Sequence, residues 1–431
     1  MSDLGAHTFT MTDKDSLELL RIDDSLSARA FPKILFRDSI LDFYPHADIH
    51  IRDKQGVISE KLFMIEGLHI ETKLGRDEII SPDPDNKDIL GGYLVNQYGW
   101  AKHDIAQIEI KNHIAGDYLF MLIPVNYFKD APDTKAYNDT ISNVVKKVVM
   151  DSSAMDHKEF DSKGNKKIFI GETKTDKNIW YQAGRLSRYF LESLASRAVS
   201  KTYANSPYYT FLNNKGEFYF MSASEMLSQA PICNYRIEET VDSVKDPFVI
   251  KAYSVQSGGS LISKINYNKR FHKIKSDGTS PSEDIGIESY KQRVDGSGTL
   301  SSKKDKLLIL KNGSLGITSR ITSIDNFGLF DDKEDNNIYT AWKNNFYIDS
   351  ALPYRLIVQI FFNPKLCAGK VITLTVNKII EDAYASEYSG AWLILESRVN
   401  MDIEGFPVQQ LLIGKAGVAI DSNHPALNKF I

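Results

Sequence analysis

The sequence predicts an α+β protein that is predominantly β. Strand-like alternation of apolar and polar residues occurs in the first 125 residues and returns between about 336 and 415. Helical periodicity followed by a hairpin pattern lies between these stretches, over 126–240. We therefore expect two antiparallel β regions that are separated by an α+β region.

Composition sets limits on the class of protein. At roughly 100–200 residues per domain, 431 residues predict two to four domains. A hydrophobic content of 42% is that of a folded chain, and a net charge of −4 argues against a dedicated nucleic-acid binder. The two cysteines, Cys233 and Cys367, are too few for a disulfide framework or a thiolate zinc site. The first residues, MSDLG, show no basic region followed by an apolar one, so no secretory signal is expected.

The first β region is indicated by two strand patterns and an apolar run. Residues 62–74 (LFMIEGLHIETKL) alternate as a half-buried strand does, and isoleucines within 105–110 mark a second extended stretch. We expect a turn at 115–117, where glycine precedes aspartate, and then an apolar strand over 118–125. That run is far shorter than the roughly 20 residues of a membrane helix, so no membrane insertion is expected. Residues 81–88 (SPDPDNKD) predict a surface loop, and the whole region predicts a meander that closes on itself.

Two helices and a hairpin are predicted in the middle region. Valines recur at helical spacing within 141–150, and a polar loop is expected at 161–167. A longer helix is predicted over 176–201, with Asp176 as its N-cap. Strands at 208–212 and 217–221 follow, and Asn-Asn-Lys-Gly between them is a hairpin loop because Asn and Gly accept positive φ.

The last part of the chain predicts an insertion and a second meander. Residues 266–335 are weakly hydrophobic and rich in Lys, Ser, Asp and Gly, which indicates a flexible or inserted surface segment. Two short strands are expected within it, at 306–310 and 316–321. The second meander has strands at 355–362, 369–377, 391–399 and 408–414.

No local motif predicts a catalytic, cofactor or metal site. His46 and His50 have the spacing of zinc ligands on a helix, but the residues around them alternate as a strand, which separates the two by about 13 Å. The acidic stretches at 81–88 and 331–337 lack the glycine and closing glutamate of an EF-hand loop. Neither cysteine has a neighbour that would lower its pKa, so both are expected to be buried and unreactive. We therefore assign no catalytic residue, no cofactor ligand and no metal ligand, and expect no enzymatic activity.

The long predicted helix carries several cations on one face. Arg185, Arg188, Arg197 and Lys201 could form a phosphate-binding stripe, but Glu192 interrupts it. Because the chain as a whole is not basic, we interpret this face as a solvated helix surface.

Three stretches resemble the central hub protein of tailed-phage baseplates. The first is Ile179-Trp180, the long helix and the aromatic hairpin over 208–220. The second combines 367–376 and 388–394 with the returning strand at 408–413, and is similar to the last barrel of the hub. The third is 62–74, with Gly67, which resembles a strand of the first barrel. The hub part of type VI secretion spike proteins is related to this family.

The resemblance implies a fold and a domain order. It implies two tail-tube-like antiparallel β-barrels with an α+β domain inserted between them. The first barrel then takes residues 1–125, the α+β domain 126–240, and the second barrel 241–265 and 336–415. The segment 266–335 and a C-terminal tail at 416–431 complete the chain.

The resemblance also implies an assembly. Three copies would form a homotrimeric, pseudo-sixfold ring between the tail tube and the central spike, so the tail tube protein and the spike protein are the expected partners. Tape-measure and baseplate wedge proteins are further candidates, and DNA is cargo that passes through the ring. The expected location is the virion tail baseplate, assembled in the host cytoplasm.

Other functions stay open on the sequence alone. The chain could serve a bacterial contractile injection or type VI secretion apparatus, and genome neighbours would separate the two. A tail-associated glycan hydrolase would need paired carboxylates in a concave site, which require no local motif. A receptor-binding module is a further alternative, since the chain has 21 tyrosines and 22 phenylalanines.

Overall fold

The structure is a computed structural model of the whole chain. The described residues are 8–12, 18–23, 33–53, 69–80, 89–94, 100–111, 115–151, 164, 166–174, 178–203, 206–237, 248, 250, 252–256, 352, 354–376, 389–402 and 408–415. None of the helices in these ranges is both long and apolar enough to cross a membrane.

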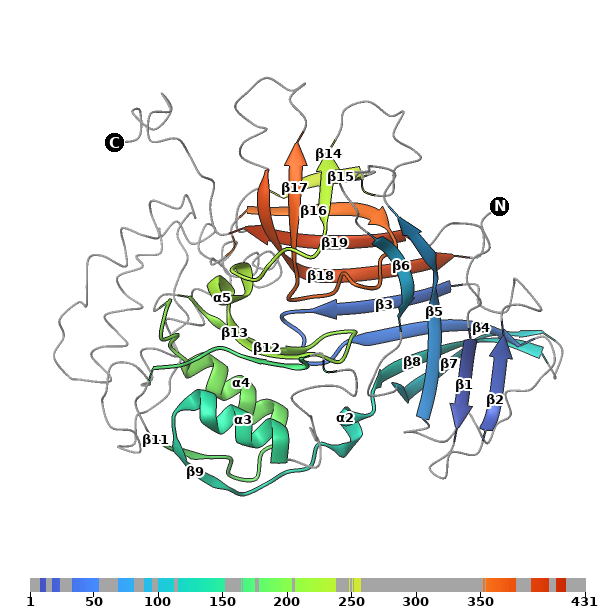
Figure 1. Cartoon of the computed structure of the whole chain (residues 1–431). Helices are drawn as coiled ribbons and strands as arrows, with labels where there is room; N and C mark the ends of the chain where they lie inside the picture. The colour runs from blue at the N-terminus through green and yellow to red at the C-terminus, as the bar shows by residue number, and fades with distance from the viewer. Residues whose placement is uncertain are drawn as a thin grey trace, which may run out of the picture.

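A network of fourteen strands dominates the fold (Figure 1). Along its main path the order is β15-β16-β19-β18-β3-β4-β8-β7-β5-β1-β2, with β6 beside β5, β17 beside β18 and β14 beside β17. All neighbours are antiparallel except β14 and β17. The strands are β1 (Thr8–Thr12), β2 (Glu18–Asp23), β3 (Lys33–Ser39), β4 (His46–Asp53), β5 (His69–Ile80), β6 (Ile89–Leu94), β7 (Trp100–Lys111), β8 (Ala115–Pro124), β14 (Asn234–Ile237), β15 (Ala252–Gln256), β16 (Tyr354–Phe361), β17 (Val371–Val376), β18 (Gly390–Asp402) and β19 (Val408–Lys415).

The pairing of β3 with β18 joins the first β region to the second, and we call it the seam. Residues 33–39 pair in register with 396–402, which places buried Phe36 opposite buried Val399. An ion pair crosses the seam, with Arg37 Nε 3.0 Å from Glu396 Oε1. A bulge after Ile394 bends β18, so its first residues pair with β17 instead of β3. No pairing among the described strands closes either β region on itself.

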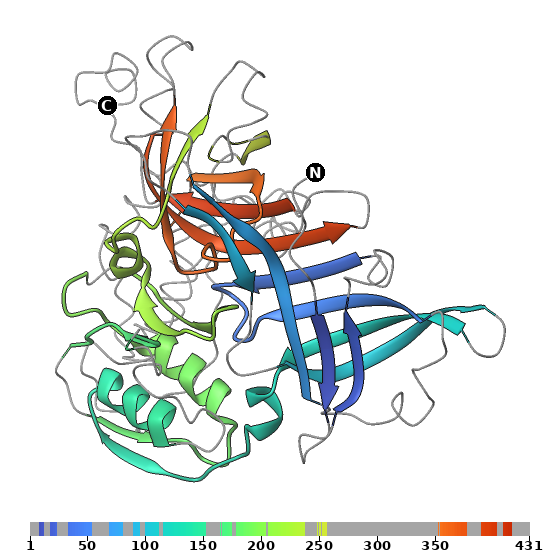
Figure 2. The same cartoon turned by 45° about the vertical axis from the view of Figure 1, so that its right-hand side comes forward.

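The α+β region lies below the second β region and beside the first (Figures 1 and 2). Parallel pairing of β10 with β13, and antiparallel pairing of β13 with β12, makes a three-stranded sheet; β9 and β11 form a separate pair. Its elements are α2 (Asn126–Lys129), β9 (Ala136–Asp139), α3 (Ile141–Asp151), β10 (Ile168–Ile170), β11 (Asn178–Tyr181), α4 (Ser187–Arg197), β12 (Tyr208–Leu212), β13 (Phe218–Ser222) and α5 (Ala223–Leu227).

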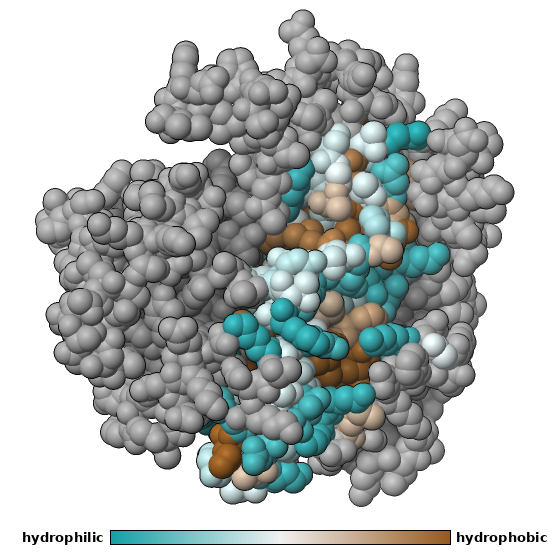
Figure 3. Space-filling view, turned by 60° about the vertical axis from the view of Figure 1, so that its left-hand side comes forward, coloured by the Kyte–Doolittle hydropathy of each residue, from teal (hydrophilic) through white to brown (hydrophobic). Residues whose placement is uncertain are grey.

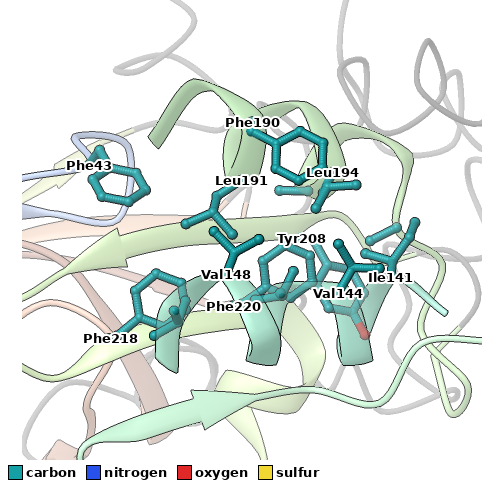
Figure 4. Close-up of a cluster of buried hydrophobic side chains, with 14 of the residues drawn as sticks. Phe43, Ile141, Val144, Val148, Phe190, Leu191, Leu194, Tyr208, Phe218 and Phe220 are labelled. Atoms are coloured by element: carbon teal, nitrogen blue, oxygen red, sulfur yellow. The ribbon is translucent and has the colours of Figure 1, made fainter. Parts of the chain in front are cut away.

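The β12–β13 hairpin is buried on both faces, which explains why apolar residues run along it without alternating with polar ones. On one face Phe218 and Phe220 pack with α3 and α4. Figure 4 shows these rings beside Val148 of α3 and Leu191 of α4. On the other face, aromatic side chains of the hairpin pack against the second β region. The hairpin is therefore the middle layer between the helices and the strands β17 and β18.

Most of the predicted elements within the described residues are confirmed. The helix expected at 141–150 is α3, the hairpin is β12–β13, and the four strands of the second meander are β16 to β19. Residues 69–74 of the first predicted strand lie in β5, whereas 62–68 lie outside the described residues. The loop at 81–88, the segment 266–335 with its two short strands, and the tail at 416–431 also lie outside them. The domain boundaries stay predictions.

The long helix predicted over 176–201 is wrong in its first half. Residues 178–181 form strand β11, and the helix α4 begins only at Ser187. Ala183 and Gly184 take φ values of 49° and 70°, a left-handed reversal that no helix accommodates. The helical spacing of Ile179 was misleading, because that residue is 50% exposed while Trp180 points into the core. The helix also ends at Arg197, four residues before the predicted end.

The turn predicted at 115–117 is also wrong. Gly116 and Asp117 lie within β8 and pair with β4 on one side and β7 on the other. Strand β7 ends at Lys111 and β8 begins at Ala115, and the residues between them lie outside the described residues. Glycine before aspartate gave a misleading turn signal here, because two partner strands hold that dipeptide extended.

The N-terminus of α4 is capped from a distant loop, by Asp130, whereas the predicted cap Asp176 lies outside the described residues. Asp130 Oδ1 accepts from the Ser187 N–H at 2.8 Å, and Oδ2 accepts from the Arg188 N–H at 3.2 Å. We expect Asp130→Ala to lower the free energy of unfolding by about 1–2 kcal/mol. Two backbone N–H groups would lose their acceptor, and the helix N-terminus would lose a nearby negative charge that stabilises the helix dipole. Hydrogen exchange of peptides that cover α4 should become faster. The control is Asp133→Ala in the same loop, where the carboxylate is exposed and caps no helix; equal acceleration by both variants would contradict this assignment.

Candidate functional site

The residues considered as sites from the sequence do not come together. His46 and His50 lie on β4, as the alternating pattern predicted, and His50 Nε2 is 3.7 Å from Asp117 Oδ2. No group of three or more metal-ligating side chains is found among the described residues. Cys233 and Cys367 are buried, as predicted, and burial raises the pKa of the Cys367 thiol.

The four cations predicted on one helix face are also dispersed. Arg185 precedes α4, and Lys201 follows it and pairs with Glu172 at 2.7 Å. Arg188, on the first turn, stacks on the ring of Tyr127 instead of pointing along a stripe. The acidic stretch at 331–337 lies outside the described residues.

A buried polar cluster occurs where the two β regions meet the β12–β13 hairpin, and we call it the junction cluster. Its residues are Asp38, Asn213, Asn214, Glu217, Tyr219, Cys367 and Lys370. They come from the end of β3, from the hairpin loop and strand β13, and from the turn before β17. Asp38 connects all three segments, because its Oδ2 accepts from the N–H groups of Asn214 at 3.1 Å and Ala368 at 3.0 Å.

A buried ion pair lies beside Asp38. Lys370 Nζ is 2.8 Å from Glu217 Oε2, and both side chains are almost fully buried. The same oxygen accepts from Asn213 Nδ2 at 2.8 Å and from the Tyr219 hydroxyl at 3.0 Å. Burial alone would raise the pKa of Glu217, but the Lys370 ammonium and these donors hold it below its usual value. Glu217 is therefore an ionised carboxylate whose Oε2 has three partners.

Three aromatic rings form a stack next to this ion pair. Tyr219 lies between Phe211 and Phe169. Its ring centre is 4.9 Å from that of Phe211 and 4.7 Å from that of Phe169, and the ring planes are nearly parallel. Lys370 Nζ lies 5.0 Å from the centre of the Phe169 ring. Gly369 contacts the stack closely, at a φ of 84°, which only glycine adopts without strain. The stack therefore joins β10, the hairpin and the turn before β17.

The junction cluster has the chemistry of a structural contact between segments. Its carboxylates accept from backbone and side-chain donors of other segments, and its thiol is kept protonated by burial. The hydrogen bonds of Asp38 and the ion pair of Glu217 and Lys370 favour one arrangement of the segments that they connect, whereas Asp38 Oδ1 and Asn214 Oδ1 are buried without a hydrogen-bond partner among the described residues. The site therefore sets the position of the α+β region relative to both β regions.

Asp38 gives the junction cluster a dependence on pH. Complete burial raises the pKa of Asp38 to about 7, and the charge of Glu396 adds to that effect although two N–H groups oppose it. The folded state therefore holds this proton more tightly than the unfolded state, whose value is near 4. The stability that results is complete below about pH 4 and is lost as pH rises through about 7.

We predict that the difference in free energy of unfolding between the wild type and Asp38→Asn depends on pH. The wild type should lose up to about 1.4 kcal/mol per pH unit relative to the variant between about pH 4 and 7, because asparagine keeps an acceptor oxygen but does not ionise. Urea denaturation at pH 5, 6, 7 and 8 measures this. Parallel pH curves for the two proteins would show that Asp38 does not titrate in this range.

Sequence reasoning did not find the junction cluster. Asp38 contacts residues that are 176 and 330 positions away in the sequence. The pattern of residues in a short stretch of sequence cannot indicate such contacts. One local signal was present: Glu217, a charged residue, stands directly before an aromatic strand that is buried on both faces. A buried carboxylate at such a place requires a partner cation.

Part of the surface is apolar. On the face shown in Figure 3, hydrophobic residues reach the surface between polar ones. Large apolar side chains that are more than a third exposed occur chiefly in the α+β region. They are Phe128, Met150, Ile179, Tyr181, Tyr189, Tyr203 and Ile232, with Leu41 in the loop after β3.

Comparisons with known proteins give similarities of fold only. No protein-family model and no curated protein sequence matches this chain. A tail protein from Neisseria meningitidis MC58 is similar, with a TM-score of 0.46 and 10% identity, over 96% of this chain and 98% of the other. The 43 kDa tail protein of prophage MuSo2 from Shewanella oneidensis gives 0.47 and 9%, over 94% and 95%. The E. coli c3393 protein, a component of the type VI secretion system, gives 0.43 and 9%, over 91% and 77%.

Proposed function

We propose that this chain is a structural protein of a phage tail, the central hub of the baseplate. The observation that carries the proposal is the seam, in which seven residue pairs hold β3 against β18. A seam of this length holds two β regions of one chain in a fixed relation. If each region curves into a tube-like barrel whose outer strands stay open, three chains place six barrels around one axis, and a threefold hub can then meet a sixfold tube.

The ends of the large sheet suit such an assembly. Among the described strands, β2 pairs only with β1, and β15 pairs only with β16. Edge strands of this kind present unpaired backbone groups to a neighbouring chain, and pairing between copies removes the aggregation hazard of an open edge. In the proposal these edges lie at contacts between barrels.

The proposed role is one of shape and association and not of catalysis. The hub would bind the central spike protein on one side and the tail tube protein on the other, within the virion tail. DNA would pass through the ring as cargo. The net charge of −4 suits that passage, because a strongly cationic wall would retain phosphates.

Mass photometry of the full chain tests the proposal. A concentration series should give a trimer, either alone or after addition of the candidate spike protein, with serum albumin as the matched addition that should change nothing. A monomer at every concentration, with and without the spike protein, would contradict the proposal.

A further inference from the structure

Arg188, on the first turn of α4, is held between two tyrosine rings. Its guanidinium carbon lies 4.5 Å from the ring centre of Tyr127 and 4.7 Å from that of Tyr189. Its Nη2 donates to the Tyr189 hydroxyl at 3.3 Å. Two rings at these distances fix the plane of the guanidinium, so the side chain has little freedom left to lose when it binds a ligand.

Arg188 forms no ion pair with any carboxylate of the described residues. Two carboxylates lie near it. Asp130 accepts from backbone N–H groups of α4 instead of from the guanidinium. Glu192, one helical turn away, is exposed and beyond ion-pair distance. The Arg188 Nε is buried and has no hydrogen-bond partner. The Arg188 guanidinium is thus held by tyrosines and is half-buried, and it forms no ion pair with a carboxylate of the described residues.

Apolar surface surrounds this cation. Phe128 is 41% exposed and Tyr189 is 51% exposed, and Phe128 packs edge-on against Tyr127. Tyr127 in turn rests edge-on against the buried Tyr44, with ring centres 5.8 Å apart, which makes the platform rigid. Arginine and tyrosine beside exposed apolar area are the typical composition of a binding hot spot.

We propose that Tyr127, Phe128, Arg188 and Tyr189 form a docking patch for a partner-protein segment that presents an aspartate or glutamate carboxylate beside an apolar side chain. The carboxylate pairs with the Arg188 guanidinium, whose planar fork matches two carboxylate oxygens. The apolar side chain covers Phe128.

The charges around the patch favour a protein segment over a nucleic acid. Asp130 and Glu192 flank the single stacked cation, and they repel a run of phosphates more strongly than one carboxylate. The inference goes beyond the hub proposal and does not depend on ring formation.

A peptide array tests the patch on the full folded chain. The probes are 12-residue peptides that carry one Asp or Glu flanked by Leu or Phe, and matched peptides in which Asn or Gln replaces the acid. The wild type should bind the best acidic peptides about tenfold more tightly than their amide partners, as for a charge-assisted pair. Arg188→Gln should abolish that preference, and Arg188→Lys should reduce it because the fork and the stacking are lost.

The matched control is Arg185→Gln, which removes the same charge from an exposed position three residues away. It should keep the preference for acidic peptides, and denaturant midpoints should show that all variants are folded. The proposal is overturned by equal binding of acidic and amide peptides, by absence of binding, or by equal losses in both glutamine variants. It is also overturned if Arg188→Gln weakens binding of a 20-nucleotide single-stranded DNA more than binding of the acidic peptides. These readouts do not require a trimer, so they fail independently of the hub proposal.

Discussion

Replacing Lys370 with methionine is expected to lower the free energy of unfolding by about 3–5 kcal/mol, because a buried carboxylate would be left without its cation. Glu217 would keep two neutral donors, Asn213 and Tyr219, but neither compensates a full charge. Equilibrium denaturation in urea at pH 7 measures the effect. The loss should appear in the transition that separates the hairpin from the second β region.

Two further variants distinguish the cost of a buried, unpaired carboxylate from the cost of removing a lysine charge. Lys201→Met breaks an ion pair of nearly the same length, 2.7 Å to Glu172, but both partners are largely exposed, so little change is expected. The double variant Lys370→Met/Glu217→Gln should recover part of the stability, since no uncompensated charge remains. Equal effects of Lys370→Met and Lys201→Met would show that the junction cluster does not exclude water.

Replacing Gly369 with alanine is expected to destabilise the protein by about 2–4 kcal/mol, from backbone strain together with overpacking. At a φ of 84° a Cβ is strained, and it would also lie 2.7 Å from Phe211 Cζ and 3.3 Å from Tyr219 Cε1. Because both rings belong to the stack, the strain should spread to the contact between hairpin and second β region. Denaturant midpoints and near-ultraviolet circular dichroism measure the stability and the ring packing.

Gly164→Ala is the matched control for this substitution. Gly164 has nearly the same φ, 81°, but no atom of the described residues lies within 4 Å of the Cβ that alanine would add. It should therefore cost only the backbone part, about 1 kcal/mol. The difference between the two variants isolates the packing against Phe211. If both variants lose equal stability, the stack tolerates the extra methyl group and is looser than the structure indicates.

Elements whose signals are local could be predicted from the sequence. The β12–β13 hairpin was predicted because aromatic strands flank an Asn-Asn-Lys-Gly loop, and Gly216 indeed has a positive φ of 66°. Helix α3 was predicted from the spacing of its valines, of which Val144, Val145, Val148 and Val149 are all buried. In both elements the period of the apolar residues matches the surface that is buried.

Elements decided by distant contacts could not be predicted in the same way. Ile179 and Ala183 extended the helical pattern by coincidence, while Gly184 carried the opposing signal as a chain breaker. Residues 178–181 became a strand because β9 pairs with them, and Trp180 Nε1 donates to the Asp139 carbonyl at 3.1 Å. A strand that depends on such a partner has no signature in its own four residues.

The junction cluster and the seam illustrate the same limit. Arg37 and Glu396 pair across 359 positions, and nothing near either residue indicates the other. Such pairs depend on how the two β regions are placed, which is a property of the whole fold. The interpretation of two β regions around an α+β region was available from the sequence, whereas the seam that unites them was not.

Electron microscopy of the purified full chain together with the candidate spike protein would make the proposed ring visible. We expect hollow rings with threefold symmetry and six lobes of similar size, two from each chain. Class averages that contain only single-chain particles, or closed rings whose symmetry is not a multiple of three, would contradict that expectation.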